Sequence, residues 1–310
     1  MKSYNILSLD GGGLRGLITA ALLERLEAST PGFLQHIDLV VGTSTGGILA
    51  LTLAKGLAPY ETMRLYIDHG AEIFHRSLRR KVGGLFGLAR AKYDNDGLKK
   101  VLSDVFGKDR LKNLKKKVAI TSFKLADRGN IHPPTWNPKI FHNFPGEDSD
   151  GEEFTVDVAM RTSAAPTYFP TTDGFVDGGT VANNPSMVAL AQALDPRSQL
   201  GPGRELASIR LLSVGTGVNA QYVTGERLDW GLGQWARPLL DILLDGVSEI
   251  ADFQCKQILR EKYFRLQVEL PEGREIPMDG VGDMNLMLQL GQQASIRPAA
   301  MWLRASGWTE

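Results

Sequence analysis

The sequence predicts an α/β fold in which helices cover both faces of a mostly parallel sheet. Apolar, strand-like runs alternate with periodic helical segments from the first residues onward. The strand runs are almost continuously apolar, which is typical of strands buried on both faces. Glycine-rich turns join the first two runs to the helices that follow. Strand–turn–helix units in this order predict parallel strands connected by helical crossovers.

The hydrophobic pattern gives the expected position of each element. Strands are expected at the apolar runs 4–9, 37–41, 116–123 and 209–217. Helices are expected where apolar residues recur at helical spacing, at 17–28, 47–56, 59–75, 95–106, 185–194 and 234–262. The long segment 234–262 fits a core helix better than the wall of an acyl channel. Residues 281–306 are also expected to be helical, with a break or kink at Pro298.

The simplest domain organisation is one domain over residues 1–310. The chain has 310 residues, of which 43% are hydrophobic and 23% charged, as in ordinary globular proteins. No internal repeat or long linker divides it. The acidic stretch 146–153 lacks the distal bidentate glutamate of a calcium loop, so we expect a solvated surface loop there.

Charge and cysteine content exclude several functional classes. Basic and acidic residues number 35 each, so no net positive field favours nucleic acid. Cys255 is the one cysteine, which excludes intramolecular disulfides and cysteine-rich zinc sites. Neither a signal peptide nor an apolar run long enough to span a bilayer is visible. We therefore expect a cytoplasmic protein that at most binds a membrane surface peripherally.

The first glycine cluster, LSLDGGGLRG at residues 7–16, admits a dinucleotide site. It follows a predicted strand, opens a helix and contains the pattern G-x-G-x-x-G. However, Asp10 would repel a pyrophosphate, and the acidic residue expected at the end of the next strand is absent. The pattern alone is therefore weak evidence for a nucleotide.

The same cluster also fits an oxyanion hole. Gly11, Gly12 and Gly13 would present backbone N–H groups at a helix N-terminus, where a negative oxygen is stabilised. Arg15 adds a positive charge suited to an oxyanion or a phosphate head group. A tight strand–helix turn without a ligand is the third possibility.

A second glycine turn holds a candidate nucleophile. Residues 42–46, GTSTG, match G-x-S-x-G between a predicted strand and a helix. Glycines two residues either side of Ser44 would permit a sharp turn without steric clash. The Ser44 hydroxyl would then project at a helix N-terminus, whose dipole favours alkoxide character. The alternative is a helix start capped by Thr43 or Ser44.

A serine nucleophile needs a base, and the residue pattern leaves its identity open. No histidine follows His142, which argues against the common Ser…Asp…His order. His69, His75, His132 and His142 are each more typical of surface or capping positions. Asp177 precedes two glycines that allow a tight turn, and partial burial would raise its pKa towards that of a base. A structural Asx-turn role for Asp177 is equally compatible with its spacing.

Three segments together resemble the patatin-like phospholipase family: DGGGLRG (10–16), GTSTGG (42–47) and DGG (177–179). They occur in the family's order and at its usual separations. Further similar stretches lie at 93–107, 161–170, 176–190 and 211–217. The resemblance covers about residues 4–217, and 218–310 is expected to be a helical portion packed on the catalytic part.

The resemblance implies a three-layer α/β/α sandwich and a phospholipase A-type serine esterase. Ser44 would be the nucleophile and Asp177 the general base of a Ser–Asp dyad without histidine. Gly11, Gly12 and Gly13 would form the oxyanion hole, with Arg15 in the family's arginine position. The resemblance also implies that neither a metal, calcium included, nor any other cofactor takes part.

The implied substrate is an acyl ester of a phospholipid or related lipid, reached at a membrane surface. One alternative is a regulated membrane-degrading effector of a defence or toxin system with the same chemistry. A non-catalytic lipid-binding or dinucleotide-binding protein is the other. Residues 76–92 combine basic side chains with the apolar run VGGLFGLA, which suits a lid or membrane-contact segment and equally a solvated loop.

Overall fold

One sheet organises the protein. The computed structural model describes residues 3–75, 90–125, 135–195, 205–218, 229–235 and 238–309. Seven strands of this described part follow the order β4-β3-β2-β1-β6-β7, with β5 also paired to β3. They are β1 (Tyr4–Leu9), β2 (Leu39–Thr43), β3 (Lys117–Lys124), β4 (Asn137–His142), β5 (Phe175–Asp177), β6 (Ile209–Val214) and β7 (Tyr263–Leu266).

The sheet is mostly parallel, as the sequence predicts. Neighbouring strands run parallel from β3 through β2, β1 and β6 to β7. Only β4 and β5 are antiparallel, and both pair with β3. Strand direction therefore changes at β3, and the turn that holds Ser44 and the strand that ends in Asp177 both lie next to this strand.

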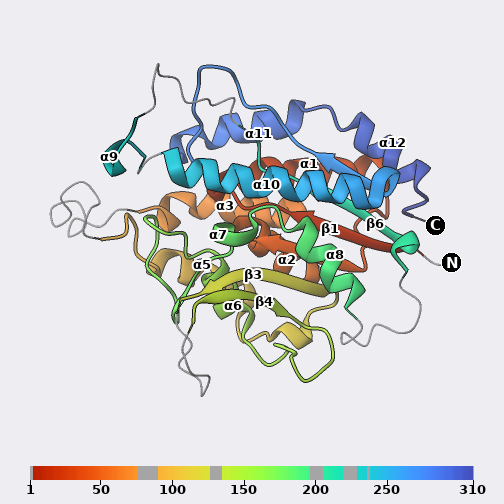
Figure 1. The fold of residues 1–310 in the computed structure, drawn as a ribbon, viewed down its shortest axis with the longest axis horizontal. Coiled ribbons are helices and arrows are strands. Elements are labelled where there is room, and N and C mark those ends of the chain that lie inside the picture. Colours follow the sequence, from red (N-terminus) through yellow and green to blue (C-terminus); the bar gives the residue numbers. More distant parts are fainter. Residues whose placement is uncertain are drawn as a thin grey trace.

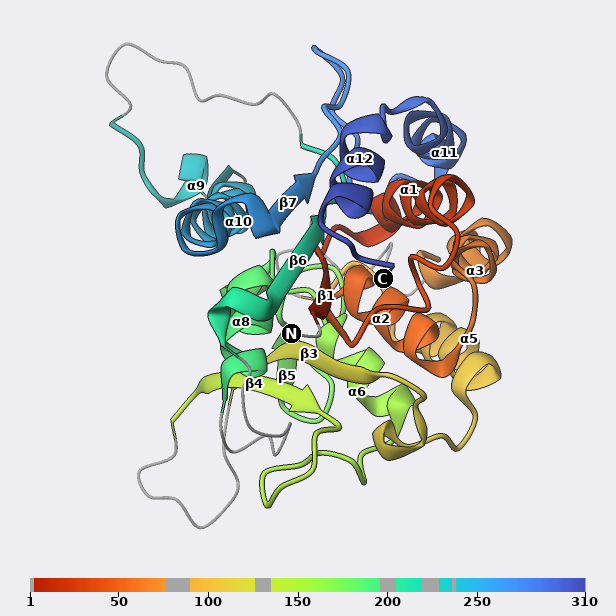
Figure 2. The ribbon, with the colours of Figure 1, turned by 90° about the vertical axis from the view of Figure 1, so that its right-hand side faces the viewer.

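Helices cover both faces of the sheet and complete the expected α/β/α sandwich (Figures 1 and 2). One layer comprises α1 (Gly16–Ser29), α2 (Thr45–Lys55), α3 (Pro59–Ile73), α5 (Asp96–Phe106), α6 (Thr155–Thr162), α11 (Met284–Gln293) and α12 (Arg297–Ala305). The opposite layer comprises α7 (Gly179–Ala182), α8 (Ser186–Leu194), α9 (Leu232–Trp235) and α10 (Pro238–Leu259).

Side chains of the central strands alternate between two hydrophobic cores. In β1, Leu7 joins the core shared with α1 and α2, whereas Ile6 joins the core shared with α8 and α10. Val40 and Val41 divide in the same way in β2. Because successive residues point to opposite, equally covered faces, these strands have no polar side.

The C-terminal part differs from the sequence-based expectation. β7 adds a parallel edge strand where only helix was expected. The expected helix 281–306 is two helices, and Pro298 lies in the first turn of α12, where its missing N–H removes no helical hydrogen bond. Across the described residues, no helix combines the length and apolar character that crossing a membrane requires.

Candidate active site

Ser44 lies in the sharp turn between β2 and α2. Its backbone has φ 54° and ψ −122°, a region that residues with side chains rarely adopt. Gly42 and Gly46 make the turn possible, because a Cβ on Gly42 would collide with the Gly46 carbonyl and one on Gly46 with the Leu9 carbonyl. The expected strand–turn–helix arrangement is therefore present.

Neighbouring hydrogen bonds hold this strained turn. The backbone N–H of Ser44 donates to Thr162 Oγ1 at 2.9 Å, and the Thr162 hydroxyl donates to the Thr121 carbonyl at 2.6 Å. The Thr43 hydroxyl donates to the Ala182 carbonyl at 2.6 Å. Strain of this kind persists only where surrounding structure fixes it, and it is typical of functional turns.

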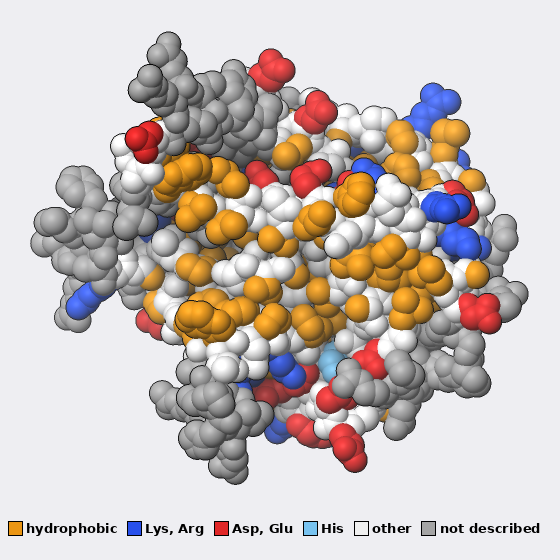
Figure 3. Space-filling model, viewed as in Figure 1, with side chains coloured by type: hydrophobic (Ala, Val, Ile, Leu, Met, Phe, Trp, Pro, Cys, Tyr) orange, Lys and Arg blue, Asp and Glu red, His pale blue; other side chains and the backbone are white. Residues whose placement is uncertain are grey.

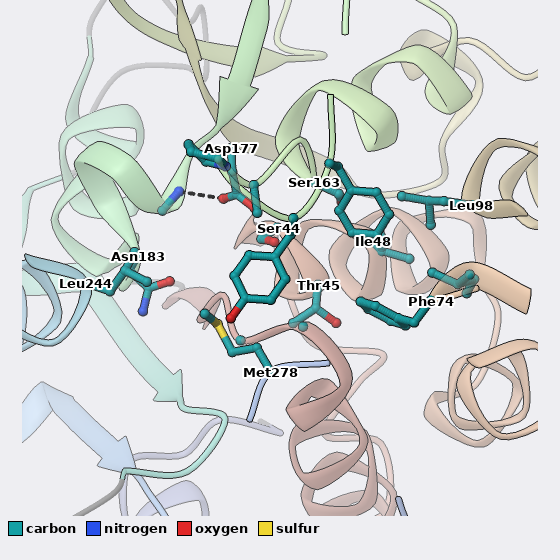
Figure 4. Close-up of a pocket in the computed structure, with 18 of the residues that line it drawn as sticks. Ser44, Thr45, Ile48, Phe74, Leu98, Ser163, Asp177, Asn183, Leu244 and Met278 are labelled. Carbon is teal, nitrogen blue, oxygen red and sulfur yellow. Dashed lines mark hydrogen bonds between the residues drawn. The ribbon is translucent and has the colours of Figure 1, made fainter. Parts of the chain in front are cut away.

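The register of β3 brings Ser44 and Asp177 together. Thr43, which precedes Ser44, lies opposite Thr121 of β3, and Asp177 of β5 lies opposite Ser122. Because β4 pairs with residues 119–124 along one edge of β3, β2 and β5 lie end to end along the other edge, which brings the serine turn and Asp177 to adjacent positions. Figure 4 shows both side chains at the same end of a cavity.

The Asp177 carboxyl group is buried and hydrogen-bonded. Its Oδ1 accepts the Gly179 N–H at 2.7 Å, marked in Figure 4, and the Ser44 side chain lies beside the carboxyl group. Burial raises the pKa of Asp177 to about 6, and the neighbouring Ser44 hydroxyl and the Gly179 N–H oppose that rise. The Asx turn and the contact with Ser44 therefore coexist, and the group is mostly a carboxylate at neutral pH.

No histidine of the described residues lines the cavity beside Ser44. His69 hydrogen-bonds Glu72 at 3.3 Å on α3, and His142 is buried at the end of β4 against Phe144. His132 lies outside the described residues. Asp177 is thus the titratable group that the described structure places against the serine.

The glycine turn contributes to the cavity in part. Gly12 and Gly13 line it, whereas the Gly11 N–H donates to the Asn183 carbonyl at 3.1 Å. In the described part of the chain, no hydrogen bond is recorded for the N–H of Gly12 or Gly13. Arg15 is half-buried in the 3₁₀ helix that follows and is not among the residues lining the cavity. The geometry favours Gly12 and Gly13 over Gly11 as donors.

Asp10, in the same turn, is neutralised within the protein. Both of its carboxylate oxygens accept from Arg265 of β7, at 2.8 and 2.5 Å, and both side chains are buried. Burial raises the pKa of Asp10, while the Arg265 charge lowers it. Sequence analysis did not identify Arg265. The acidic residue Asp10 in the glycine turn indicated that a buried cation would pair with it, but no sequence pattern showed which residue that cation was.

The cavity has a polar end and an apolar body. It is partly open to solvent. Ser44, Asp177 and Asn183 lie at the polar end, and the apolar walls include Ile48, Ile73, Phe74, Leu98, Phe169 and Leu244. Leu244 belongs to α10, so the expected core helix also forms part of the cavity wall. An apolar cavity ending in a few convergent polar groups is typical of a site for a small apolar ligand.

A C-terminal segment that carries no sequence motif also reaches the site. Met278 lines the cavity, and its carbonyl accepts the Leu14 N–H at 2.7 Å. Next to it, the buried carboxylate of Asp279 accepts the Tyr93 hydroxyl at 2.6 Å and pairs with Lys92. These contacts join residues near both ends of the chain, which a local pattern could not reveal.

The chain is similar to several known proteins. Residues 7–190 match the family model described as patatin-like phospholipase. A cGAMP-activated phospholipase of Pseudomonas aeruginosa is 35% identical over 86% of this chain and 78% of its own. The protein teg of Priestia megaterium is 29% identical over 98% of each chain. The crystal structure of VipD from Legionella pneumophila matches 93% of this chain and 67% of its own, with 10% identity and a TM-score of 0.41.

The family model spans the three segments that carry the sequence-based resemblance, and the fold brings these segments together around one cavity. The family model covers more than half of the chain, and the relative at 35% identity extends beyond it on the C-terminal side. The protein therefore belongs to the patatin-like phospholipase family and is a lipid acyl hydrolase of the serine esterase type.

Proposed function

We propose that this protein cleaves fatty acyl esters of phospholipids or related lipids with Ser44 as nucleophile and Asp177 as general base. The observation that carries the proposal is the position of the Ser44 side chain beside the buried Asp177 carboxyl group at the polar end of one cavity. It joins a serine in a strained turn to a base whose pKa of about 6 suits proton transfer near neutral pH.

The first half-reaction forms an acyl-enzyme. Ser44 Oγ attacks the ester carbonyl carbon while the Asp177 carboxylate takes the hydroxyl proton. The carbonyl oxygen becomes an oxyanion, and the N–H groups of Gly12 and Gly13 stabilise it. The tetrahedral intermediate collapses, the ester C–O bond breaks, and the proton on Asp177 passes to the departing alkoxide. The products are an alcohol and an acyl ester of Ser44.

The second half-reaction repeats this chemistry with water. Asp177 takes a proton from water as the water oxygen attacks the acyl-enzyme carbonyl. Collapse breaks the bond to Ser44 Oγ, which recovers the proton from Asp177, and the fatty acid leaves. Asp177 is therefore returned to its carboxylate form at the end of each half-reaction.

The cavity walls suggest which part of the lipid enters. The side chains beyond Ser44 are apolar, including Phe74, Leu98 and Phe169, which suits an acyl chain and not a charged head group. We therefore propose an A-type cleavage that releases fatty acid. Because Leu244 and Met278 belong to the C-terminal part, we also propose that residues 1–310 act as one catalytic unit.

We further propose that this chemistry takes place on lipid at a membrane surface, with the protein peripheral and cytoplasmic, and without a metal or other cofactor. The basic and apolar segment 76–92 remains a candidate for membrane contact on composition. Residues 76–89 lie outside the described residues, so the structure adds nothing to that part of the proposal.

Product analysis tests the reaction class. Phosphatidylcholine vesicles incubated with the wild-type protein should yield free fatty acid and lysophospholipid. Ser44→Ala should yield neither, whereas Ser103→Ala, a change at an exposed serine of α5, should retain the wild-type rate. Release of phosphocholine, or fatty acid release that persists in Ser44→Ala, would refute the proposal.

A second proposal concerns regulation and rests on similarity alone. The relative at 35% identity is a phospholipase activated by cGAMP. We propose that this chain is likewise a regulated effector whose hydrolysis increases with a cyclic dinucleotide. Fatty acid release should then rise at least about tenfold with cGAMP, while AMP and GMP should have no effect. Equal rates with and without cGAMP would reject this regulation and leave the Ser–Asp chemistry intact.

A further inference from the structure

Asn183 is a polar residue of the cavity to which the Ser–Asp chemistry gives no role. It directly follows α7 and lines the cavity together with Ser44 and Asp177. Its backbone carbonyl accepts the Gly11 N–H at 3.1 Å, which fixes the residue against the glycine turn. Its side chain therefore starts from a fixed backbone position beside the reacting groups. Figure 3 shows the face of the molecule on which α10, the helix next to Asn183, lies.

Helix α10 fixes the orientation of the Asn183 amide. The Ser248 hydroxyl donates its hydrogen to the Leu244 carbonyl at 2.8 Å, so its oxygen can only accept from another group. Asn183 Nδ2 donates to that oxygen at 3.1 Å. A flipped amide would place two acceptors against each other, so the amide oxygen, Oδ1, points away from Ser248. Figure 4 shows this oxygen on the side of the amide that faces Ser44.

Asn183 Oδ1 lies close to both members of the Ser–Asp pair. A Cβ on Gly11 would lie 2.4 Å from this oxygen and 3.3 Å from Ser44 Cβ. A Cβ on Gly179 would lie 3.3 Å from the same oxygen and 3.1 Å from Asp177 Oδ1. The amide can therefore occupy this place only because residue 11 is glycine, and its oxygen lies near the serine and the carboxylate alike.

The same oxygen is an acceptor to which the described structure supplies no donor. Across the described residues, no hydrogen bond is recorded for Asn183 Oδ1, and the residue is half-buried at the cavity wall. The carbonyls of the ester and the acyl-enzyme are themselves acceptors, and an oxyanion would be repelled. The donor that the second half-reaction brings to this place is water.

We propose that Asn183 positions the hydrolytic water, an inference that rests on the Ser–Asp chemistry proposed above. The water donates one hydrogen to the Asp177 carboxylate and the other to Asn183 Oδ1, so that a lone pair of its oxygen points at the acyl-enzyme carbonyl carbon. Asp177 takes the first proton as the new C–O bond forms, and the second hydrogen stays on that oxygen in the fatty acid. The first half-reaction has less need of this group, because the departing oxygen is held covalently by the acyl carbon.

Competition between methanol and water tests the proposal, because the product ratio reports only the step after the acyl-enzyme. Methanol has one hydroxyl hydrogen, which goes to Asp177, so methanol makes no use of Asn183. With p-nitrophenyl butyrate in dilute methanol, Asn183→Leu should raise the ratio of methyl butyrate to butyrate at least about fivefold. Its kcat/KM for the ester reports acylation and should fall by a smaller factor.

Two further variants separate positioning of water from a structural role. Ser248→Ala removes the bond that orients the amide and should raise the ratio by a smaller factor. It should add nothing in the Asn183→Leu background, because both changes act on one group. Asn95→Leu is the matched control, since Asn95 is also half-buried and its side-chain oxygen has no partner among the described residues, but it does not line the cavity. Its ratio should equal that of the wild type.

Three results would overturn the proposal. A ratio that stays at the wild-type value in Asn183→Leu would show that the water does not use this group. A fall in kcat/KM at an unchanged ratio would assign Asn183 to the departing alcohol. An equal rise in Asn95→Leu would reduce the effect to a general disturbance of the fold, which urea unfolding of each variant would register. Failure of the underlying Ser–Asp chemistry is recognised separately, because Ser44→Ala would then still release butyrate.

Discussion

The backbone N–H of Leu14 donates a 2.7 Å hydrogen bond to the carbonyl of Met278. This bond joins the glycine turn near one end of the chain to a segment near the other, and both line the cavity that holds Ser44. Asp279, the next residue, fixes that segment by binding Tyr93 and Lys92. The C-terminal part is therefore expected to support the site and not merely to cover it.

Asp279→Ala should reduce both stability and activity. The change leaves the Tyr93 hydroxyl without its acceptor and should lower the free energy of unfolding by about 2 kcal/mol. It should also lower kcat/KM, because Met278 would no longer be held against the glycine turn. Asp283→Ala is the control, since Asp283 pairs with the exposed Arg274 and should cost under about 1 kcal/mol. Urea unfolding and ester hydrolysis measure both effects, and equal losses in the two variants would contradict this role.

The pH dependence of kcat/KM should report Asp177. The base acts as a carboxylate, and burial raises the pKa of Asp177 to about 6. The rate on a short-chain ester should therefore fall about tenfold per pH unit below that value. A profile that stays flat down to about pH 4, the region of an unperturbed aspartate, would contradict the assignment.

Asp177→Asn should stabilise the protein at neutral pH while it abolishes activity. The pKa of Asp177 is raised on folding from 3.8 to about 6, so the folded state binds more protons between these values. Its contribution to stability is present below about pH 4 and is lost as pH rises through about 6. Removing the buried charge should therefore raise the free energy of unfolding at pH 7.5 by at most about 3 kcal/mol. Unfolding in urea at pH 7.5 and pH 4 measures this gain, and an equal gain at both pH values would contradict the explanation.

The buried ion pair beneath the glycine turn should be expensive to break. Arg265→Met leaves the Asp10 carboxylate buried without its partner and should cost about 3–5 kcal/mol. Arg274→Met removes an arginine from an exposed pair and should cost under about 1 kcal/mol. Thermal and urea unfolding of the two variants compare them directly, and similar small losses would show that Asp10 finds another partner.

Features of this site that depend on residues close together in the sequence could be predicted, and features that depend on distant residues could not. The Ser44 turn could be predicted, because Gly42 and Gly46 are required within a few residues of the serine itself. The position of Asp177 against Ser44 could not be derived from spacing, since it depends on the register of two strands on β3. The family resemblance supplied that pairing.

The C-terminal contribution was beyond local patterns. Arg265 lies in a four-residue edge strand, and Met278 and Asp279 lie in a loop without a motif, so neither hydrophobic periodicity nor spacing indicated them. Helix α10 was expected to be an amphipathic core helix, and its pattern did not show that one apolar stripe would face solvent. Helical periodicity identifies an apolar face but not the surface that covers it.

The most direct test of the Ser–Asp pair is kcat/KM on a short-chain acyl ester for the wild-type protein, Ser44→Ala and Asp177→Asn. A short chain reduces the dependence on membrane binding, so the comparison isolates the chemistry. Both variants should lose at least about a thousandfold in kcat/KM, because nucleophile and base act as one unit. Activity within about tenfold of wild type in either variant would contradict the pair.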